Sequence, residues 1–170
     1  ENGYTPILGR ASRSINERGS EYVLTKIAKF SQTIKRPVEQ LRILVVGLAF
    51  KGMPETSDIR DSIAANIVKK LPSKANISVK DFVVSSADIA ALGCTADEGE
   101  LQEIIPNYDV ILFMNNHYRN NKFNVIQALQ KCDNPVLFFD GWNMFDWREI
   151  ERLPKVCYST MGYSTAGFLS

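Results

Sequence analysis

The segment between residues 41 and 71 constrains the fold of this chain more than any other. A run of β-branched and apolar residues at 43–46 ends at Gly47, and a polar loop then leads into an amphipathic segment at 58–71. This order of strand, glycine turn, loop and helix opens a unit of an α/β fold. Backbone N–H groups at the start of such a helix attract anions, so the segment predicts a phosphate-binding turn.

The turn departs from the pattern G-x-G-x-x-G that binds dinucleotide pyrophosphates. Ala49 occupies the second glycine position, although Gly52 stands at the third. The methyl group of Ala49 hinders the closest approach of a pyrophosphate, whereas Lys51 and Arg60 supply cations nearby. We therefore expect these cationic side chains, and not the backbone N–H groups, to bind the phosphates. The alternative is that Gly47 only turns the chain and that Lys51 is a solvated loop lysine.

The remaining hydrophobic pattern alternates between helix-like and strand-like segments. This alternation predicts an α/β fold, a Rossmann-like, mostly parallel sheet flanked by helices and preceded by a long N-terminal helix. We expect residues 1–36 to form the helix segment and residues 37–170 the α/β domain. Ser62 is the expected N-cap of the helix that ends at residue 71. Other expected helices cover residues 11–34, 87–92, 100–105 and 121–131, and other expected strands 77–84, 109–114, 135–140 and 156–159.

Polar clusters follow four of the predicted strands, at residues 47–51, Asp81, 115–117 and 140–143. Ligands of parallel sheets bind beyond the carboxyl ends of the strands, so we expect these clusters to meet in one crevice.

Each cluster also has a purely structural interpretation. His117 is the single histidine and would then be a structural hydrogen bonder, and Asp140 would only cap a turn. Trp142, Phe145 and Trp147 would then be core or interface aromatics and not a stacking platform.

Composition excludes several classes of function. The formal net charge is +1, so we expect no strongly basic face and no nucleic-acid partner. No apolar run approaches the ~20 residues of a membrane span. One histidine and three widely spaced cysteines argue against an ordinary zinc site, and we expect the three thiols to be buried and reduced. The start lacks both an initiator Met and a signal-peptide pattern, which suggests a piece of a longer cytoplasmic polypeptide.

Five motifs in order resemble one family. G-L-A-F-K at 47–51 with D-I-R-D-S at 58–62 resembles the signature that opens the C-terminal, nucleotide-sugar-binding domain of the UDP-glucose/GDP-mannose dehydrogenase family. The other similar motifs are A-S-R-S-I-N at 11–16, D-V-I-L-F-M at 109–114 with His117, F-F-D-G-W-N-M-F at 138–145, and Y-S-T-M-G-Y at 158–163.

The resemblance implies an activity and site residues. It implies that the chain is the substrate-binding part of an NAD-dependent nucleotide-sugar 6-dehydrogenase, which oxidises the sugar C6 alcohol to a carboxylate in two hydride transfers for polysaccharide precursor synthesis. Phe50 and Lys51 would contact the nucleotide diphosphate sugar, and Arg60 would face the NAD. Trp142 stands where the family often has an arginine that binds the nucleotide end, and its ring would stack on the substrate instead.

The resemblance also implies a homodimer built on the long helix, in which Arg13, or Arg10 one turn away, enters the partner subunit's site. An apolar stripe supports this dimer, because one small domain is not expected to cover it completely. The stripe comprises Ile15, Tyr22, Val23, Ile27, Phe30 and Ile34.

The family's dinucleotide fingerprint and its G-G-x-C-x-P-x-D cysteine motif do not occur in these 170 residues. We therefore expect no catalytic residue here and no dehydrogenase activity from the chain alone. Two other classes remain open: a stand-alone nucleotide-binding regulatory module and a purely structural dimerisation domain.

Overall fold

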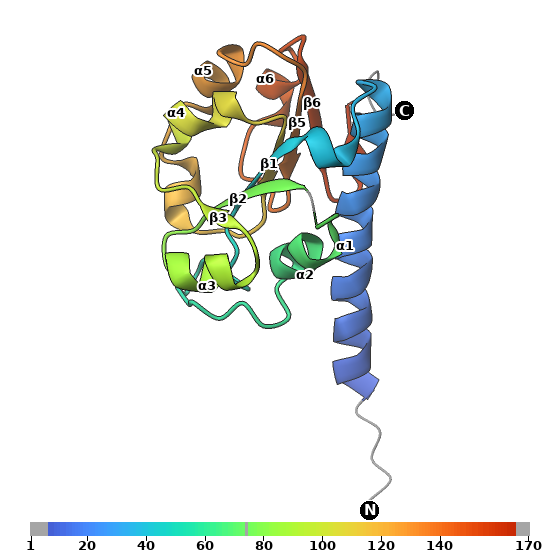
Figure 1. Ribbon diagram of the computed structural model, residues 1–170, viewed down its shortest axis with the longest axis vertical. Coiled ribbons are helices and arrows are strands. Elements are labelled where there is room, and N and C mark those ends of the chain that lie inside the picture. Colours follow the sequence, from blue (N-terminus) through green and yellow to red (C-terminus); the bar gives the residue numbers. More distant parts are fainter. Residues whose placement is uncertain (1–6, 74, 166–170) are drawn as a thin grey trace, which may run out of the picture.

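A single mixed sheet organises the chain (Figure 1). The computed structural model describes residues 7–73 and 75–165, with side chains from residue 17 onward. Within these residues the strand order is β3-β2-β1-β4-β5-β6-β7, and all neighbours are parallel except the antiparallel pair β6 and β7. The predicted α/β architecture is therefore confirmed. The strands are β1 (Arg42–Val46), β2 (Asn76–Lys80), β3 (Thr95–Ala96), β4 (Val110–Phe113), β5 (Val136–Asp140), β6 (Val156–Thr160) and β7 (Tyr163–Ser164).

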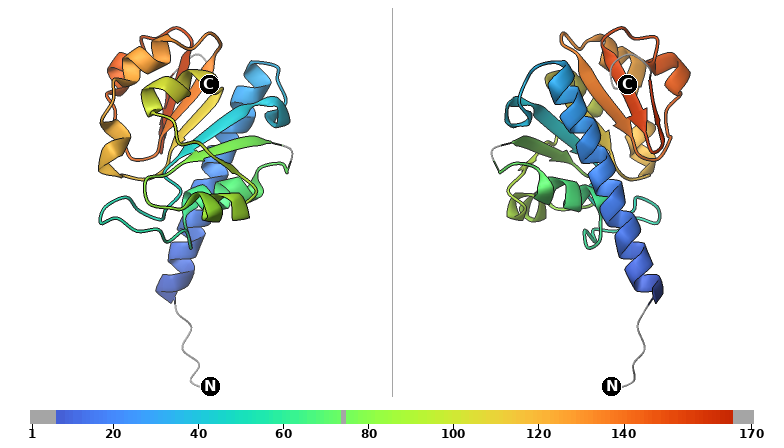
Figure 2. Two further views of the ribbon diagram at one scale, coloured as in Figure 1. Left: turned by 60° about the vertical axis from the view of Figure 1, so that its left-hand side comes forward. Right: turned by 90° about the vertical axis from the view of Figure 1, so that its right-hand side faces the viewer.

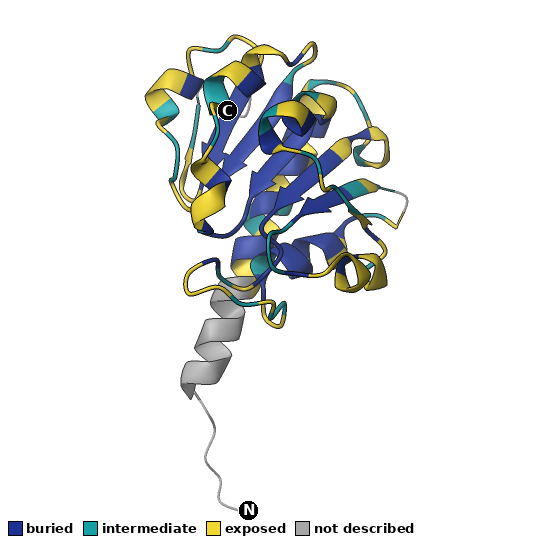
Figure 3. Ribbon diagram, turned by 90° about the vertical axis from the view of Figure 1, so that its left-hand side faces the viewer, coloured by how far each residue is buried: buried dark blue, intermediate teal, exposed yellow. Residues whose placement is uncertain are grey.

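Helices cover both faces of the sheet, so the central strands are buried on both sides (Figures 2 and 3). Alternate strand residues point to two separate cores, one beneath α1 and α2 and one beneath α4 and α5. This explains why the central strands read as continuous apolar runs and not as alternating ones. The α-helices are α1 (Ile7–Thr33), α2 (Ile63–Lys70), α3 (Ser86–Ala91), α4 (Leu101–Ile104), α5 (Val125–Gln130) and α6 (Trp147–Ile150), and the 3-10 helices are η1 (Val38–Gln40), η2 (Ile105–Asn107) and η3 (Tyr118–Asn121).

Helix α1 packs along the domain and continues past it at its N-terminal end (Figure 1). Val23, Ile27 and Phe30 are at most 1% exposed, and the Tyr22 hydroxyl donates to the Thr160 carbonyl at 3.2 Å. This part of the apolar stripe is therefore covered within the monomer and offers no surface to a partner. The side chains of Arg10, Arg13 and Ile15 lie outside the described residues, so the structure does not place them.

Local hydrogen bonds set several element boundaries. Ser62 caps α2 as predicted: its hydroxyl accepts the Ala65 N–H at 3.3 Å. The helix expected at 121–131 begins only at Val125, because the Asn124 side chain accepts the Gln127 N–H at 3.0 Å and caps the helix there. The strand expected at 77–84 stops at Lys80, where the chain turns. The short elements β3, β7 and α6 were not predicted.

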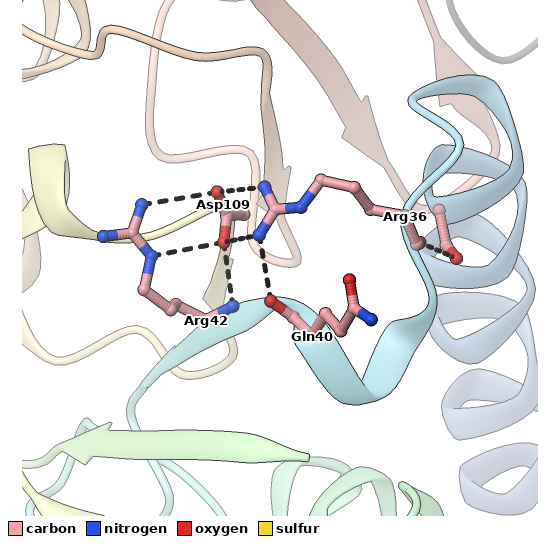
Figure 4. Close-up of polar contacts among 5 residues, drawn as sticks. Arg36, Gln40, Arg42 and Asp109 are labelled. Carbon is pink, nitrogen blue, oxygen red and sulfur yellow. Dashed lines mark hydrogen bonds and ion pairs between the residues drawn. The ribbon is translucent and has the colours of Figure 1, made fainter.

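A buried carboxylate ties three segments together at the amino end of the sheet (Figure 4). Asp109 is 1% exposed and forms ion pairs with Arg36, which follows α1, at 2.9 Å and with Arg42 of β1 at 3.3 Å. Burial alone would raise the pKa of the Asp109 carboxyl, but the arginine hydrogen bonds outweigh it and lower that pKa. Asp109 therefore fixes the end of α1 against the first and fourth strands, at the edge opposite the carboxyl ends.

Candidate functional site

The glycine turn lies where strand order reverses, at the carboxyl ends of the adjacent strands β1 and β4. Gly47 has a φ of 87°, and a Cβ there would overlap the side chain of Asn115 just beyond β4. Asn115 is buried, and its side-chain oxygen accepts the His117 N–H at 3.2 Å. Glycine is therefore required both by the backbone conformation and by the close approach.

The backbone donors of this turn are already used. The Asp81 carboxylate at the end of β2 accepts the N–H groups of Leu48 and Ala49 at 2.7 and 3.1 Å. In a dinucleotide-binding domain the corresponding turn leaves its donors free for a pyrophosphate. Here a carboxylate takes that place, so the residues of this turn do not fit a dinucleotide such as NAD.

A pocket of about 580 Å³ opens beside the turn. Phe50 and Trp142 flank it with side chains that are 50% and 47% exposed. Lys51 supplies its cation, and the described residues provide neither a hydrogen bond nor an ion pair for that ammonium group. The pocket therefore combines apolar walls with one available positive charge. It is lined by Phe50, Lys51, Met53, Ile63, Met114, Asn116, Gly141 and Trp142.

Backbone contacts hold the two sides of the pocket. The Gly52 N–H donates to the Asn116 side chain at 3.0 Å, and a Cβ at Gly52 would overlap the backbone of His117. Across the pocket, the indole N–H of Trp142 donates to the Met114 carbonyl at 3.0 Å. The loop that carries Lys51 and the indole ring are thus both anchored to the end of β4.

The strand-end clusters converge as the sequence predicts. Gly47, Lys51, Asn116 and Trp142 meet around one pocket or its supporting turn, although Asp81 supports the turn and does not line the pocket. Met53, Ile63 and Met114 also line the pocket and were not singled out. Met114 is the last residue of the predicted strand 109–114, so its place near a strand end was a usable signal. Nothing in the sequence marks Met53 or Ile63 as pocket residues.

Asp140 acts as a cap. Its buried carboxylate accepts the N–H groups of Trp142 at 3.3 Å and Phe145 at 3.0 Å, and the hydroxyl of Tyr158 at 3.2 Å. Burial first, and then the Asp140 charge, raises the pKa of the Tyr158 hydroxyl. The structural interpretation of Asp140 is therefore correct: it orients the turn that presents Trp142.

His117 is likewise structural. It is 4% exposed, and its ring stacks between Phe82 and Tyr118 with centroid distances of 4.9 and 4.8 Å. Its Nδ1 accepts the Arg119 N–H at 3.2 Å, so Nε2 carries the proton that faces the Glu55 carboxylate at 2.9 Å. The ring therefore fastens the loop after Lys51 to the end of β4.

Arg60 lies outside the pocket that contains Lys51. Its guanidinium forms an exposed ion pair with Asp58 at 2.7 Å, and hydrogen bonds from Arg60 lower the pKa of the Asp58 carboxyl to about 2. Arg60 also lines a smaller hollow of about 310 Å³ together with Phe50 and Asp61. Phe50 borders both hollows, so a ligand in one lies next to a ligand in the other.

The aromatic residues after β5 divide between core and pocket. Phe145 packs edge-to-face on Phe113 and Phe138 at 4.9 and 5.2 Å, and Trp147 is partly buried on the same core. The core interpretation is therefore correct for Phe145 and Trp147. Trp142 is the exception, because half of its side chain stays exposed over the pocket.

The cysteines provide no nucleophile. Cys94, Cys132 and Cys157 are free and buried, as predicted, and burial raises the pKa of each thiol, to about 12 for Cys157. Throughout the described ranges, no group of three or more His, Cys, Asp or Glu residues is arranged to hold a metal ion. No helix in the same residues has both the length and the apolarity to cross a membrane.

Comparison with protein families identifies a known domain within the chain. Residues 44–147 match the UDP binding domain of the UDP-glucose/GDP-mannose dehydrogenase family. That span contains the turn, the loop with Lys51 and the turn with Trp142. No curated protein matches the chain significantly.

Solved structures share the fold at low identity. A UDP-D-ManNAc dehydrogenase from Pyrococcus horikoshii superimposes with a TM-score of 0.70 at 19% identity, over 95% of this chain and 35% of its own. A UDP-glucose dehydrogenase from Pyrobaculum islandicum superimposes with a TM-score of 0.57 at 18% identity, over 80% of this chain and 28% of its own. A phosphoglycerate oxidoreductase from Rhizobium etli superimposes with a TM-score of 0.57 at 14% identity, over 75% of this chain and 36% of its own. The chain thus spans about a third of the length of each.

Proposed function

Because this chain belongs to the UDP-glucose/GDP-mannose dehydrogenase family, as its UDP binding domain, we propose that it binds the nucleotide diphosphate sugar for an NAD-dependent nucleotide-sugar 6-dehydrogenase. The whole reaction converts a sugar C6 alcohol to a carboxylate in two hydride transfers to NAD. The products of this oxidation are polysaccharide precursors, and the reaction takes place in the cytoplasm. The single observation that carries the binding role is the pocket in which Lys51 stands between Phe50 and Trp142.

The chemistry of the pocket suits both ends of such a ligand. The Lys51 ammonium is a compact cation without a partner among the described residues, which suits a pyrophosphate or sugar oxygen. Phe50 and Trp142 present large exposed aromatic surfaces, and aromatic faces stack on flat bases and on the apolar faces of sugars. Trp142 is held by the Met114 carbonyl, so its ring is ordered before the ligand arrives.

The residues of this chain leave the redox chemistry to another part of the enzyme. The turn after Gly47 has its donors occupied by Asp81, and the thiols are buried with raised pKa values. When bound elsewhere in the enzyme, NAD would accept the hydride. We propose that Arg60 faces this cofactor from the smaller hollow, and that the chain alone has no dehydrogenase activity.

We also propose that the enzyme is a homodimer through α1. The described part of the apolar stripe packs on its own domain, so the contact would use the portion of α1 that continues past the domain (Figure 1). Arg13 belongs to the N-terminal part of α1 and is proposed to reach the partner subunit's site. Sedimentation of the chain, and of an Ile15→Glu variant, tests this contact. A clean monomer at micromolar to millimolar concentration would contradict it.

Calorimetry with UDP, UDP-N-acetylhexosamines, UDP-glucose and GDP-mannose tests the binding role. We expect UDP-sugars to bind, and Lys51→Gln to weaken the binding by roughly tenfold or more, as for loss of a charged hydrogen bond. Lys69→Gln is the matched control, because Lys69 is exposed at the end of α2, away from the pocket. Absence of heat from every ligand at millimolar concentration would contradict the proposal and favour a purely structural dimerisation domain.

A further inference from the structure

A further hollow, of about 510 Å³, lies between α4 and the segment that joins β4 to α5. We propose that it is a binding site for a small phosphate ester. Four cations line it: Lys80 at the end of β2, Arg119 in η3, Lys122, and Lys131 after α5. We refer to these four as the basic cluster.

The charge of this hollow is unbalanced. Glu100 and Glu103 also line it, but neither comes within 4.0 Å of a cation in the described residues. Four positive groups and two negative groups leave an excess of two positive charges around one cavity. Like charges held together in this way repel, and a dianion placed between them removes that repulsion.

Two members of the basic cluster are held in place by an aromatic ring. The Arg119 guanidinium lies 4.2 Å and the Lys80 ammonium 5.5 Å from the centroid of Phe82. Lys80 is only 9% exposed, and its ammonium donates to the Glu98 carbonyl at 2.9 Å. An ammonium has three donors, so this contact leaves N–H groups for an anion. Such cation–π contacts orient the charged groups of Lys80 and Arg119 before a ligand binds.

This hollow is separate from the pocket that contains Lys51. The two share no lining residue. The rings of His117 and Phe82 stack on each other, where Phe82 lines the hollow with the basic cluster and His117 contacts Glu55 in the loop after Lys51. Failure of one site therefore does not imply failure of the other.

The size and the charge together select the ligand class. A cavity of about 510 Å³ accommodates a phosphate ester of the size of a nucleotide. The carboxylates of Glu100 and Glu103 at the same cavity would repel a nucleic-acid backbone that continues beyond it. A free phosphate ester therefore suits the site better than a polymer.

The test is backbone NMR of the chain titrated with inorganic pyrophosphate and, separately, with UMP. We expect amide shifts at residues 100–103 and 119–123 that persist in Lys51→Gln. The double variant Lys122→Gln/Lys131→Gln removes two exposed ammonium groups and should weaken this binding by roughly tenfold or more. Lys69→Gln should leave it unchanged. If pyrophosphate binds as tightly as UMP, the phosphate is the recognised group. If UMP binds more tightly, the site also contacts the nucleoside.

Three results would overturn the proposal. The first is the absence of shifts at these residues with both ligands at millimolar concentration. The second is unchanged affinity in the double variant, and the third is loss of the shifts in Lys51→Gln. The last result would assign all anion binding to the first pocket.

Discussion

The Asp81 carboxylate accepts the backbone N–H of Leu48 at 2.7 Å, in the position where a dinucleotide-binding fold holds a phosphate. The same oxygen also accepts the N–H of Ala49, and the other oxygen accepts those of Val83 and Val84. One side chain thus joins the β1 turn to the end of β2. The domain keeps the Rossmann-like strand order while the turn after Gly47 serves as a structural joint, and the proposed ligand site lies at the loop with Lys51.

Asp81→Asn should destabilise the domain. The amide has one acceptor oxygen in place of two and lacks the charge that strengthens all four hydrogen bonds. We expect a loss of about 1–3 kcal/mol in the free energy of unfolding. Urea denaturation measures this loss, with the exposed Asp133→Asn as the control. Equal stability of the two variants would show that the joint contributes little.

Gly47→Ala should cost more stability than Gly93→Ala. Both glycines have positive φ, 87° and 77°, so alanine pays the same backbone strain of about 1–2 kcal/mol at either position. A Cβ at Gly93 meets nothing within 4 Å, whereas one at Gly47 overlaps the Asn115 side chain. The difference between the two variants, measured by thermal unfolding, therefore isolates the close approach of β1 and β4. If the two losses are equal, the contact with Asn115 is not tight.

Asp109 should make stability depend on acid pH. Its pKa is lowered in the folded state, so its contribution is fully present above the unfolded value of about 3.9 and is lost as pH falls through the folded pKa. Asp109→Asn should lose about 1–3 kcal/mol at pH 7, and this loss should shrink below pH 4. Unfolding of both proteins across that range tests the expectation. Glu39→Gln, an exposed change in the neighbouring η1, should show no such convergence.

Much of the fold was predictable because its signals are local. The strand at 43–46, the Gly47 turn and the Ser62 cap each depend on residues within a few positions of one another, and the structure contains all three. The two-residue strands β3 and β7 are too short for any periodicity. The helix expected from residue 121 begins at Val125 because of a side-chain cap that periodicity does not reveal.

The sites were less predictable because they depend on distant segments. The strand-end rule brought Lys51 and Trp142 together correctly, yet Met53 and Ile63 join them only through the course of the loop. The expectation of no strongly basic face came from a net charge of +1. That sum hides the basic cluster, whose members Lys80 and Lys131 are far apart in the sequence and meet around one hollow.

The indole N–H signals of Trp142 and Trp147 give the most direct test of nucleotide binding at the pocket. These are the two tryptophans of the chain, and Trp142 lines the pocket whereas Trp147 packs on the core. On titration with UDP, the Trp142 signal should shift and the Trp147 signal should stay in place, and Lys51→Gln should weaken the response by roughly tenfold or more. If the Trp142 signal does not move at millimolar UDP, or moves equally in Lys51→Gln, the account of this pocket is wrong.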